Sequence, residues 1–263
     1  MTIQIQNNNI FLKDIGKGDP ILFLHGVPDT SDIWNGIICQ LKEDYRCIAP
    51  DWPGFGRSDS GTFLDCSLNG HADFVNELSN TIGLKKPFNL VAHDFGGISA
   101  MAFVSKYPER VHRFIISNAP FSPDYKWHFW AKIWRTPVLG KLSLIAMKKI
   151  IFYYAIRQGS RKLNRDQINA AYRYFTPKMK QMILRMYRAL PEKVWQDWNV
   201  RLLEATSKVP MLILWGQNDP YLPNWLPEMY GAKKIRRYKD SGHWVPLEEK
   251  EEFVKELRSF FSA

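Results

Sequence analysis

Short apolar runs alternate with longer segments of helical periodicity along most of this chain. Helical patterns cover, for example, Asp73–Ile82, Ile98–Tyr107 and Glu248–Phe261. Strands that alternate with helices are typical of a mostly parallel sheet covered on both faces, so the pattern predicts a doubly wound α/β fold. The Asn-Asn-Asn turn at 7–9 predicts an antiparallel hairpin at the sheet edge. The predicted strands are Ile3–Ile5, Ile10–Asp14, Ile21–Leu24, Arg46–Ala49, Asn89–Ala92, Phe114–Ser117, Met211–Trp215 and Ile235–Lys239.

The strand pattern stops over residues 121–208. Helical stretches at Pro137–Gln158, Arg165–Tyr174 and Pro177–Leu190 are separated there by proline and glycine breaks. This segment holds 18 Lys/Arg and 5 Asp/Glu, a net charge of +13, whereas the rest of the chain carries −3 and the whole chain +10. Pattern and charge change together, so we predict a helical cap domain over 121–208 and a core formed by 1–120 and 209–263.

One predicted strand leads directly into a carboxylate at a turn of small residues. Asn89–Ala92 is followed by His93 and Asp94, then by Phe95-Gly96-Gly97 and a helical stretch. This is the context of a nucleophile elbow, whose usual pattern is G-x-S-x-G, with Asp94 in place of the serine. A positioned carboxylate can displace a leaving group from saturated carbon and form an alkyl ester. We therefore predict Asp94 as a covalent nucleophile.

Two further side chains that can take part in catalysis follow later strands. Asp219 comes after Met211–Trp215, and His243 lies in the loop after Ile235–Lys239. The order nucleophile, acid and histidine is that of an α/β-hydrolase triad, and each member follows a predicted strand, where open α/β sheets place their sites. We predict the catalytic set Asp94, Asp219 and His243.

A loop after an earlier strand supplies a predicted oxyanion hole. The run Ile21–Leu24 ends in His25-Gly26-Val27-Pro28, and the Val27 N–H can point toward the nucleophile. The N–H of Phe95, directly after Asp94, is the second predicted donor. We predict a structural role for His25 itself.

These motifs together resemble the α/β-hydrolases, and Asp94 makes the chain similar to the branch that contains epoxide hydrolases and haloalkane dehalogenases. The run Asp51-Trp52-Pro53-Gly54-Phe55-Gly56-Arg57-Ser58-Asp59 is a further mark of that fold. The resemblance implies that His243 activates water to cleave the Asp94 ester and that Asp219 stabilises the imidazolium. It also implies an ionised Asp94 and a neutral His243, hence activity that falls below roughly pH 6.

The leaving group is the open question, and the resemblance implies an epoxide first. Epoxide hydrolases donate protons from two cap tyrosines, for which Tyr187 and either Tyr153 or Tyr154 are candidates. Dehalogenases hold a halide with N–H donors, commonly a tryptophan after the nucleophile, but Phe95 occupies that place and the loop offers only Val27. Haloalkane dehalogenase is therefore the alternative, and cleavage of a lactone or ester is a third hypothesis.

The aromatic content of the cap predicts an apolar pocket for a small apolar substrate. Trp130, Trp134 and Trp244 are the candidate pocket residues. Neither a cofactor nor a metal site is predicted. Three cysteines without a CxxC pair, and a start without a signal-peptide pattern, favour a cytoplasmic protein.

A binding protein without catalysis is the non-enzyme alternative. The basic cap, with Lys and apolar residues mixed over Val138–Gln158, is compatible with docking on a membrane surface. No nucleic-acid-binding motif occurs in the sequence, so we predict no nucleic-acid partner.

Overall fold

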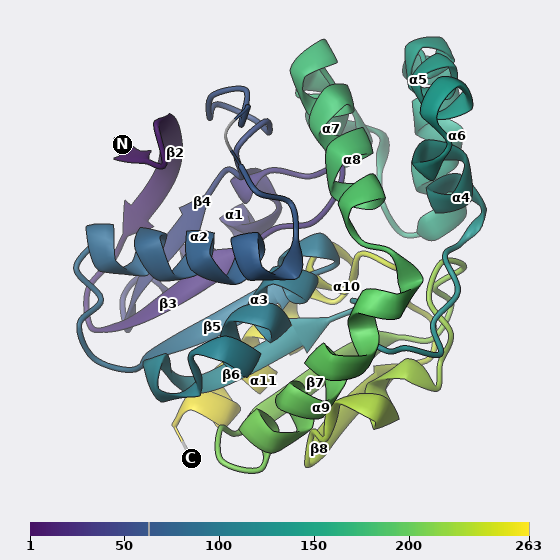
Figure 1. Cartoon of the computed structure of the whole chain (residues 1–263). Helices are drawn as coiled ribbons and strands as arrows, with labels where there is room; N and C mark the ends of the chain where they lie inside the picture. The colour runs from purple at the N-terminus through teal and green to yellow at the C-terminus, as the bar shows by residue number, and fades with distance from the viewer. Residues whose placement is uncertain (63, 263) are drawn as a thin grey trace.

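The sheet is built from parallel strands with an antiparallel edge, which confirms the predicted fold class. The computed structural model describes residues 1–62 and 64–262. The strand order is β1-β2-β4-β3-β5-β6-β7-β8; the β1–β2 and β2–β4 pairs are antiparallel, and each later pair is parallel (Figure 1). The strands are β1 (Thr2–Ile5), β2 (Asn8–Ile15), β3 (Asp19–Leu24), β4 (Tyr45–Pro50), β5 (Phe88–His93), β6 (Val111–Ser117), β7 (Met211–Gly216) and β8 (Lys234–Tyr238).

Helices cover both faces of this sheet, so its central strands are buried on both sides. Every residue of β5 and β7 is buried, as expected for parallel strands between two helical layers. Helices α2, α3 and α9 pack together on one face, and α1 packs with α11 on the other (Figure 1). The core helices are α1 (Asn35–Leu41), α2 (Leu68–Thr81), α3 (Phe95–Lys106), α9 (Trp195–Thr206), α10 (Val245–Glu248) and α11 (Lys250–Phe261), with short 3-10 turns η1 (Ser31–Trp34), η2 (Pro108–Arg110), η3 (Glu192–Val194) and η4 (Leu226–Tyr230).

The insertion between β6 and β7 forms a group of helices beside the carboxyl ends of the strands (Figure 1). Its sequence-based boundary needs correction at the C-terminal side, because α9 packs against α3 of the core. The single helix expected over Pro137–Gln158 is also divided, because the chain turns at Met147, whose side chain is buried. The cap helices are α4 (Phe129–Arg135), α5 (Pro137–Ala146), α6 (Lys149–Gly159), α7 (Arg165–Arg173) and α8 (Pro177–Ala189).

Hydrogen bonds from several elements hold the cap on the core. On α8, Arg185 donates to the carbonyl oxygens of Gly61 and Leu64, both at 2.6 Å. At the end of α6, the Gly159 carbonyl accepts the backbone N–H of His243 at 2.8 Å. The cap is therefore attached to the core both through α8 and through the end of α6.

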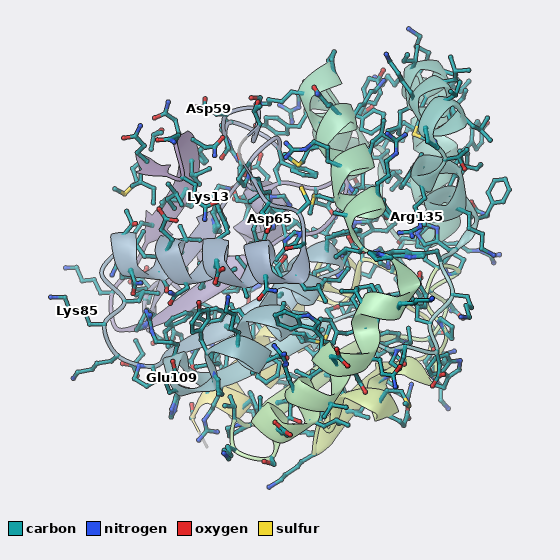
Figure 2. The ribbon with its side chains drawn as sticks, viewed as in Figure 1. Lys13, Asp59, Asp65, Lys85, Glu109 and Arg135 are labelled. Atoms are coloured by element: carbon teal, nitrogen blue, oxygen red, sulfur yellow. The ribbon has the colours of Figure 1, made fainter. Side chains whose placement is uncertain are left out.

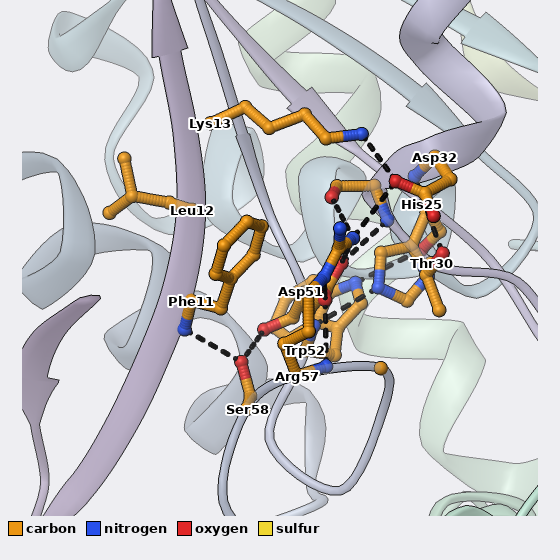
Figure 3. Close-up of polar contacts among 12 residues, drawn as sticks. Phe11, Leu12, Lys13, His25, Thr30, Asp32, Asp51, Trp52, Arg57 and Ser58 are labelled. Atoms are coloured by element: carbon orange, nitrogen blue, oxygen red, sulfur yellow. Dashed lines mark hydrogen bonds and ion pairs between the residues drawn. The ribbon is translucent and has the colours of Figure 1, made fainter. Parts of the chain in front are cut away.

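A buried polar network fixes the loop that follows β3 (Figure 3). Arg57 donates to both carboxylate oxygens of Asp51, at 2.8 and 3.2 Å. The Nε2 of His25 accepts the Trp52 backbone N–H at 3.0 Å, and the His25 carbonyl accepts the Trp52 indole N–H at the same distance. Burial lowers the pKa of His25 to about 4, so the ring stays neutral and its contacts are those of a structural residue.

Candidate active site

Asp94 occupies a sharp turn between β5 and α3, in a backbone conformation that non-glycine residues seldom adopt. Its φ and ψ are 51° and −122°. Small neighbours leave room for this turn: a Cβ on Gly96 would lie 2.2 Å from the Leu24 carbonyl oxygen, and one on Gly26 would lie 2.4 Å from the Asp94 Cβ. The geometry is that of a nucleophile elbow, which projects one side chain from the end of a strand.

The predicted oxyanion-hole loop contacts the Asp94 carboxylate directly. The Val27 N–H donates to Asp94 Oδ1 at 2.8 Å, and the Val27–Pro28 peptide bond is cis. Phe95 is the first residue of α3, so its N–H is among the helix N-terminal amides that lack an intrahelical acceptor. The carboxylate thus lies beside backbone N–H groups suited to an anionic oxygen.

The structure brings the predicted acid and histidine to the same place. His243 Nδ1 lies 2.7 Å from Asp219 Oδ2, and His243 Nε2 lies 3.6 Å from Asp94 Oδ2. Asp219 also accepts the backbone N–H of Tyr221 at 2.8 Å, which orients its carboxylate. The three side chains form one connected line, with the imidazole between two carboxylates.

These charged groups shift one another's pKa values. Burial alone would lower the pKa of His243, but the carboxylates of Asp219 and Asp94 outweigh it and raise that pKa to about 10. Burial acts to raise the pKa of Asp94, whereas the hydrogen bond and charge of His243 hold it below its usual value. The two carboxylates thus favour the protonated imidazole, which is the opposite of the neutral ring that the sequence-based mechanism requires.

An apolar cavity lies beside Asp94 and His243, which both line it. The three predicted pocket tryptophans, Trp130, Trp134 and Trp244, all line it, as does Tyr187 from α8. The Tyr187 ring packs edge-on against Phe95 with the ring centroids 4.7 Å apart. Further lining residues are Val27, Pro28, Asp94, Phe95, Pro120, Tyr125, Trp127, His128, Met147, Phe152, Ala155, Ile156, Phe175, Ile183, Tyr221, Leu222 and His243.

The other two candidate proton donors lie elsewhere. Tyr153 and Tyr154 line a separate surface depression on α6, and Tyr154 is 68% exposed. They point away because the inner face of α6 is formed by residues such as Phe152 and Ile156, on the opposite side of the helix. We therefore withdraw the prediction that either tyrosine donates a proton to the substrate.

Asn118, which the sequence analysis did not identify, orients the carboxylate of Asp219. Its Nδ2 donates to Asp219 Oδ2 at 2.7 Å, and its Oδ1 accepts the Gly216 N–H at 2.9 Å. The sequence offered a signal for Asn118, because it directly follows a predicted strand, and Asp94 and Asp219 also lie in the turns after predicted strands.

A second missed residue, His128, caps α4 and lines the cavity. Its Nδ1 accepts the Ala131 N–H at 3.4 Å, and its ring lies 5.0 Å from that of Tyr221. Burial lowers the pKa of His128 to about 4, so the ring is neutral at physiological pH. With Nδ1 as acceptor, Nε2 carries the proton. No feature of the cap sequence distinguished this histidine from a surface one.

The lining of the cavity also includes two cap tryptophans, Trp127 and Trp134, whose indole N–H groups can donate hydrogen bonds. The Nε1–H groups of Trp127 and Trp134 are buried and have no hydrogen-bond partner among the described residues. Their rings both pack against Tyr187, at centroid distances of 5.3 and 5.0 Å. The cavity is thus apolar in its bulk, with a few N–H and O–H donors on the cap side.

The chain is similar to known proteins both in sequence and in fold. Residues 19–150 match the family model for the alpha/beta hydrolase fold. A cis-3-alkyl-4-alkyloxetan-2-one decarboxylase of Shewanella oneidensis is 28% identical, with 97% of this chain and 86% of that protein covered. Haloalkane dehalogenase 2 of Mycobacterium tuberculosis is 34% identical over 42% of this chain and 38% of its own length. A laboratory-evolved variant of potato epoxide hydrolase has a TM-score of 0.82 at 18% identity over 100% of this chain and 98% of that one, a similarity of fold.

Proposed function

Because this chain belongs to the alpha/beta hydrolase fold family, we propose that it uses Asp94 to open a small, strained oxygen ring in an apolar substrate. The observation that carries the proposal is the environment of that carboxylate. One oxygen accepts the Val27 N–H at 2.8 Å, and the other lies 3.6 Å from His243 Nε2. Asp94 stands at the elbow in place of a serine, so the chemistry available there is attack by a carboxylate.

The covalent step exchanges one carbon–oxygen bond for another. A carboxylate oxygen of Asp94 bonds to a saturated ring carbon while the bond from that carbon to the ring oxygen breaks. The electron pair stays on the ring oxygen, for which Tyr187 and His128 are our candidate donors among the cavity residues. Burial raises the pKa of the Tyr187 hydroxyl well above its usual value, so this donor keeps its proton.

Our first candidate substrate is a dialkyl oxetan-2-one, the β-lactone ring named for the relative that covers nearly the whole chain. Attack of Asp94 at the alkyl carbon that bears the ring oxygen releases a carboxylate on the adjacent carbon. Loss of CO₂ from this carboxylate supplies the electron pair of a carbon–carbon double bond and expels Asp94. The products are an alkene, CO₂ and free enzyme, and no water is consumed. An imidazolium at His243 suits this route because it stabilises the departing Asp94 carboxylate.

An alkyl epoxide is the second candidate, and Tyr187 supports it as a proton donor to the ring oxygen. This reaction ends with hydrolysis of the Asp94 ester, for which His243 must act as a base. Alkylation removes the charge of Asp94, one of the two carboxylates that raise the pKa of His243. The imidazolium then loses its proton more readily and can activate water.

The test is to trap the covalent ester and identify the product. Wild-type enzyme is incubated separately with a cis-3,4-dialkyl oxetan-2-one, styrene oxide and 1,2-dibromoethane, and alkene, diol and bromide are measured. Intact-protein mass is measured for wild type, His243→Gln and Asp94→Asn. We expect alkene from the lactone and, in His243→Gln, a mass increase from the epoxide that maps to Asp94 and is absent from Asp94→Asn.

Diol as the main product would make the epoxide the substrate class. Bromide release would instead make a haloalkane the substrate class, with the indole N–H groups of Trp127 and Trp134 as the candidate donors to the departing halide. Full activity in Asp94→Asn, or no adduct and no product from any of the three compounds, would overturn the proposal.

A further inference from the structure

Helices α5 and α6 of the cap carry apolar side chains on two opposite faces. On the inner side, Met147, Phe152 and Ile156 are buried and line the cavity. A second set of large apolar side chains on these helices and on α4 is exposed. A helix that is apolar all round is usually buried, so this arrangement leaves an outer surface without a partner.

This outer surface, which we call the cap outer face, concentrates the exposed apolar residues of the protein. Of thirteen exposed large apolar side chains in the described part of the chain, eight lie within residues 129–154. On α5 they recur at a helical spacing that places them on one side, and exposed apolar side chains gathered on one part of a protein favour an interaction site there. The eight are Phe129, Val138, Leu139, Leu142, Ile145, Ile150, Ile151 and Tyr154, each between 43% and 71% exposed.

The charge around the cap outer face is of one sign. Residues 129–161 contain seven Lys/Arg and no Asp/Glu. Lys141, Lys148 and Lys149 are exposed on α5, α6 and the turn that joins them, between the exposed apolar residues. Apolar side chains next to lysines, in a segment that contains no acidic residue, match a surface that offers hydrocarbon and negative charge together.

We propose that the cap outer face docks on a lipid bilayer that contains anionic headgroups. The exposed apolar side chains enter the boundary between headgroups and acyl chains, and the lysines contact the phosphates. No helix within residues 1–62 and 64–262 combines the length and apolarity that a membrane crossing needs, so the contact is interfacial. If the proposed function holds, the docking also explains substrate supply, because alkyl-bearing rings partition into lipid and α6 has residues that line the cavity on one face and exposed apolar residues on another.

Vesicle flotation tests the docking without any measurement of activity. Wild-type protein is mixed with vesicles of phosphatidylcholine alone or with about 30% phosphatidylglycerol, at low and high NaCl. We expect flotation with the anionic vesicles only, weakened by salt. Lys148→Glu/Lys149→Glu should reduce partitioning at least about tenfold. Leu142→Ser/Ile145→Ser should reduce it to a similar extent, because less apolar area enters the bilayer.

Matched variants elsewhere control for charge and for loss of apolar area. Lys85→Glu/Lys86→Glu changes two exposed lysines, of which Lys85 lies on the side of the core away from the cap (Figure 2). Val200→Ser/Leu203→Ser changes two exposed residues of α9. Both should float like the wild type, as should Asp94→Asn, which removes the proposed catalysis. Thermal unfolding of each variant establishes that it is folded.

Two results would overturn the docking. One is wild-type protein that stays in the buffer fraction with every vesicle. The other is equal flotation of the cap outer face variants and their controls. A dimer in solution that Leu142→Ser/Ile145→Ser converts to a monomer, without flotation, would assign the face to a second copy of this chain.

Discussion

At the scale of single residues, the distances around His243 decide which carboxylate controls its charge. Asp219 lies 2.7 Å from Nδ1, whereas Asp94 lies 3.6 Å from Nε2. Coulombic attraction grows as the separation falls, so Asp219 contributes more to the raised pKa of the imidazole. Asp219 is therefore the main cause of the raised pKa of His243, and Asp94 is the carboxylate that lines the cavity.

Asp219→Asn should therefore lower the pKa of His243 by more than about one unit. The asparagine keeps an oxygen near Nδ1 but removes the charge that favours the imidazolium. NMR titration of ¹³C-labelled histidine measures this pKa, with His243→Gln used for assignment. Asp240→Asn, which changes an exposed acid two residues after β8, should leave the titration unchanged. An unaltered His243 pKa in Asp219→Asn would contradict this account.

Asp29 is a buried carboxyl group that the mechanism does not use. It accepts the indole N–H of Trp244 at 2.9 Å, directly beside the histidine loop. Burial raises the pKa of Asp29 from 3.8 to about 7. The folded protein then holds this proton more tightly than the unfolded chain between these two pH values, so the group makes folding less favourable as pH rises through that window.

Asp29→Asn should remove this pH dependence. The amide oxygen can still accept from Trp244, so the variant should gain stability relative to wild type as pH rises from about 4 to about 7, by up to about 4 kcal/mol. Urea unfolding at several pH values measures the difference. Asp124→Asn, at an exposed acid, serves as the control. A constant difference between Asp29→Asn and wild type would show that Asp29 does not titrate in this range.

Some residues of the candidate site could be identified from the sequence, and others could not. Asp94, Asp219 and His243 were identifiable because each follows a strand and their order is specific. His128 was not, since its place in the cavity depends on how α4 packs over the core. The cap tyrosines illustrate the same limit: the side of α6 that faces inward depends on tertiary packing, which places Tyr153 and Tyr154 outside.

At the scale of elements, local signals fix some helix ends, and packing fixes others. The start of α2 was predicted at Asp73, but the helix begins at Leu68 because the Ser67 hydroxyl accepts the Gly70 N–H. This serine was a readable cap. Helix α9 was assigned to the cap on its helical pattern alone, whereas its buried face packs against α3 of the core. Residues 195–208 carry no net charge, so the positive charge ends where the cap ends.

Helix α8 carries Tyr187, and Arg185 on the same helix ties it to the core. Arg185→Ala removes two charge-assisted hydrogen bonds to carbonyl oxygens, at Gly61 and Leu64. We expect a loss of about 2 kcal/mol in the free energy of unfolding and faster amide exchange along α8. Arg173→Ala, at an exposed arginine of α7, should change neither quantity. Unchanged exchange in α8 would mean that apolar packing alone holds the helix.

At the scale of the whole molecule, positive charge is concentrated in the cap and is only partly neutralised. Several cap arginines donate to carbonyl oxygens rather than to carboxylates, among them Arg157, Arg185 and Arg188. When α9 is counted with the core, the rest of the insertion, residues 121–194, still has a net charge of +13. Like charges at this density repel one another and act against the compact state.

Salt should therefore stabilise the protein. Raising NaCl from about 20 to about 200 mM shortens the screening length and should increase Tm by a few degrees. Lys148→Glu/Lys149→Glu lowers the net charge of the cap by four and should show a smaller increase. Differential scanning fluorimetry measures both. A Tm that falls with added salt would indicate that attractive ion pairs outweigh the repulsion.

One backbone hydrogen bond has a mechanical consequence for how this enzyme admits a substrate. The carbonyl of Gly159, at the tip of α6, holds the peptide N–H of His243. If α6 swings outward, this bond must break or the histidine loop must follow. Outward motion of α6 therefore either sacrifices this backbone hydrogen bond or displaces the imidazole from Asp94, and both outcomes favour the seated position of the helix.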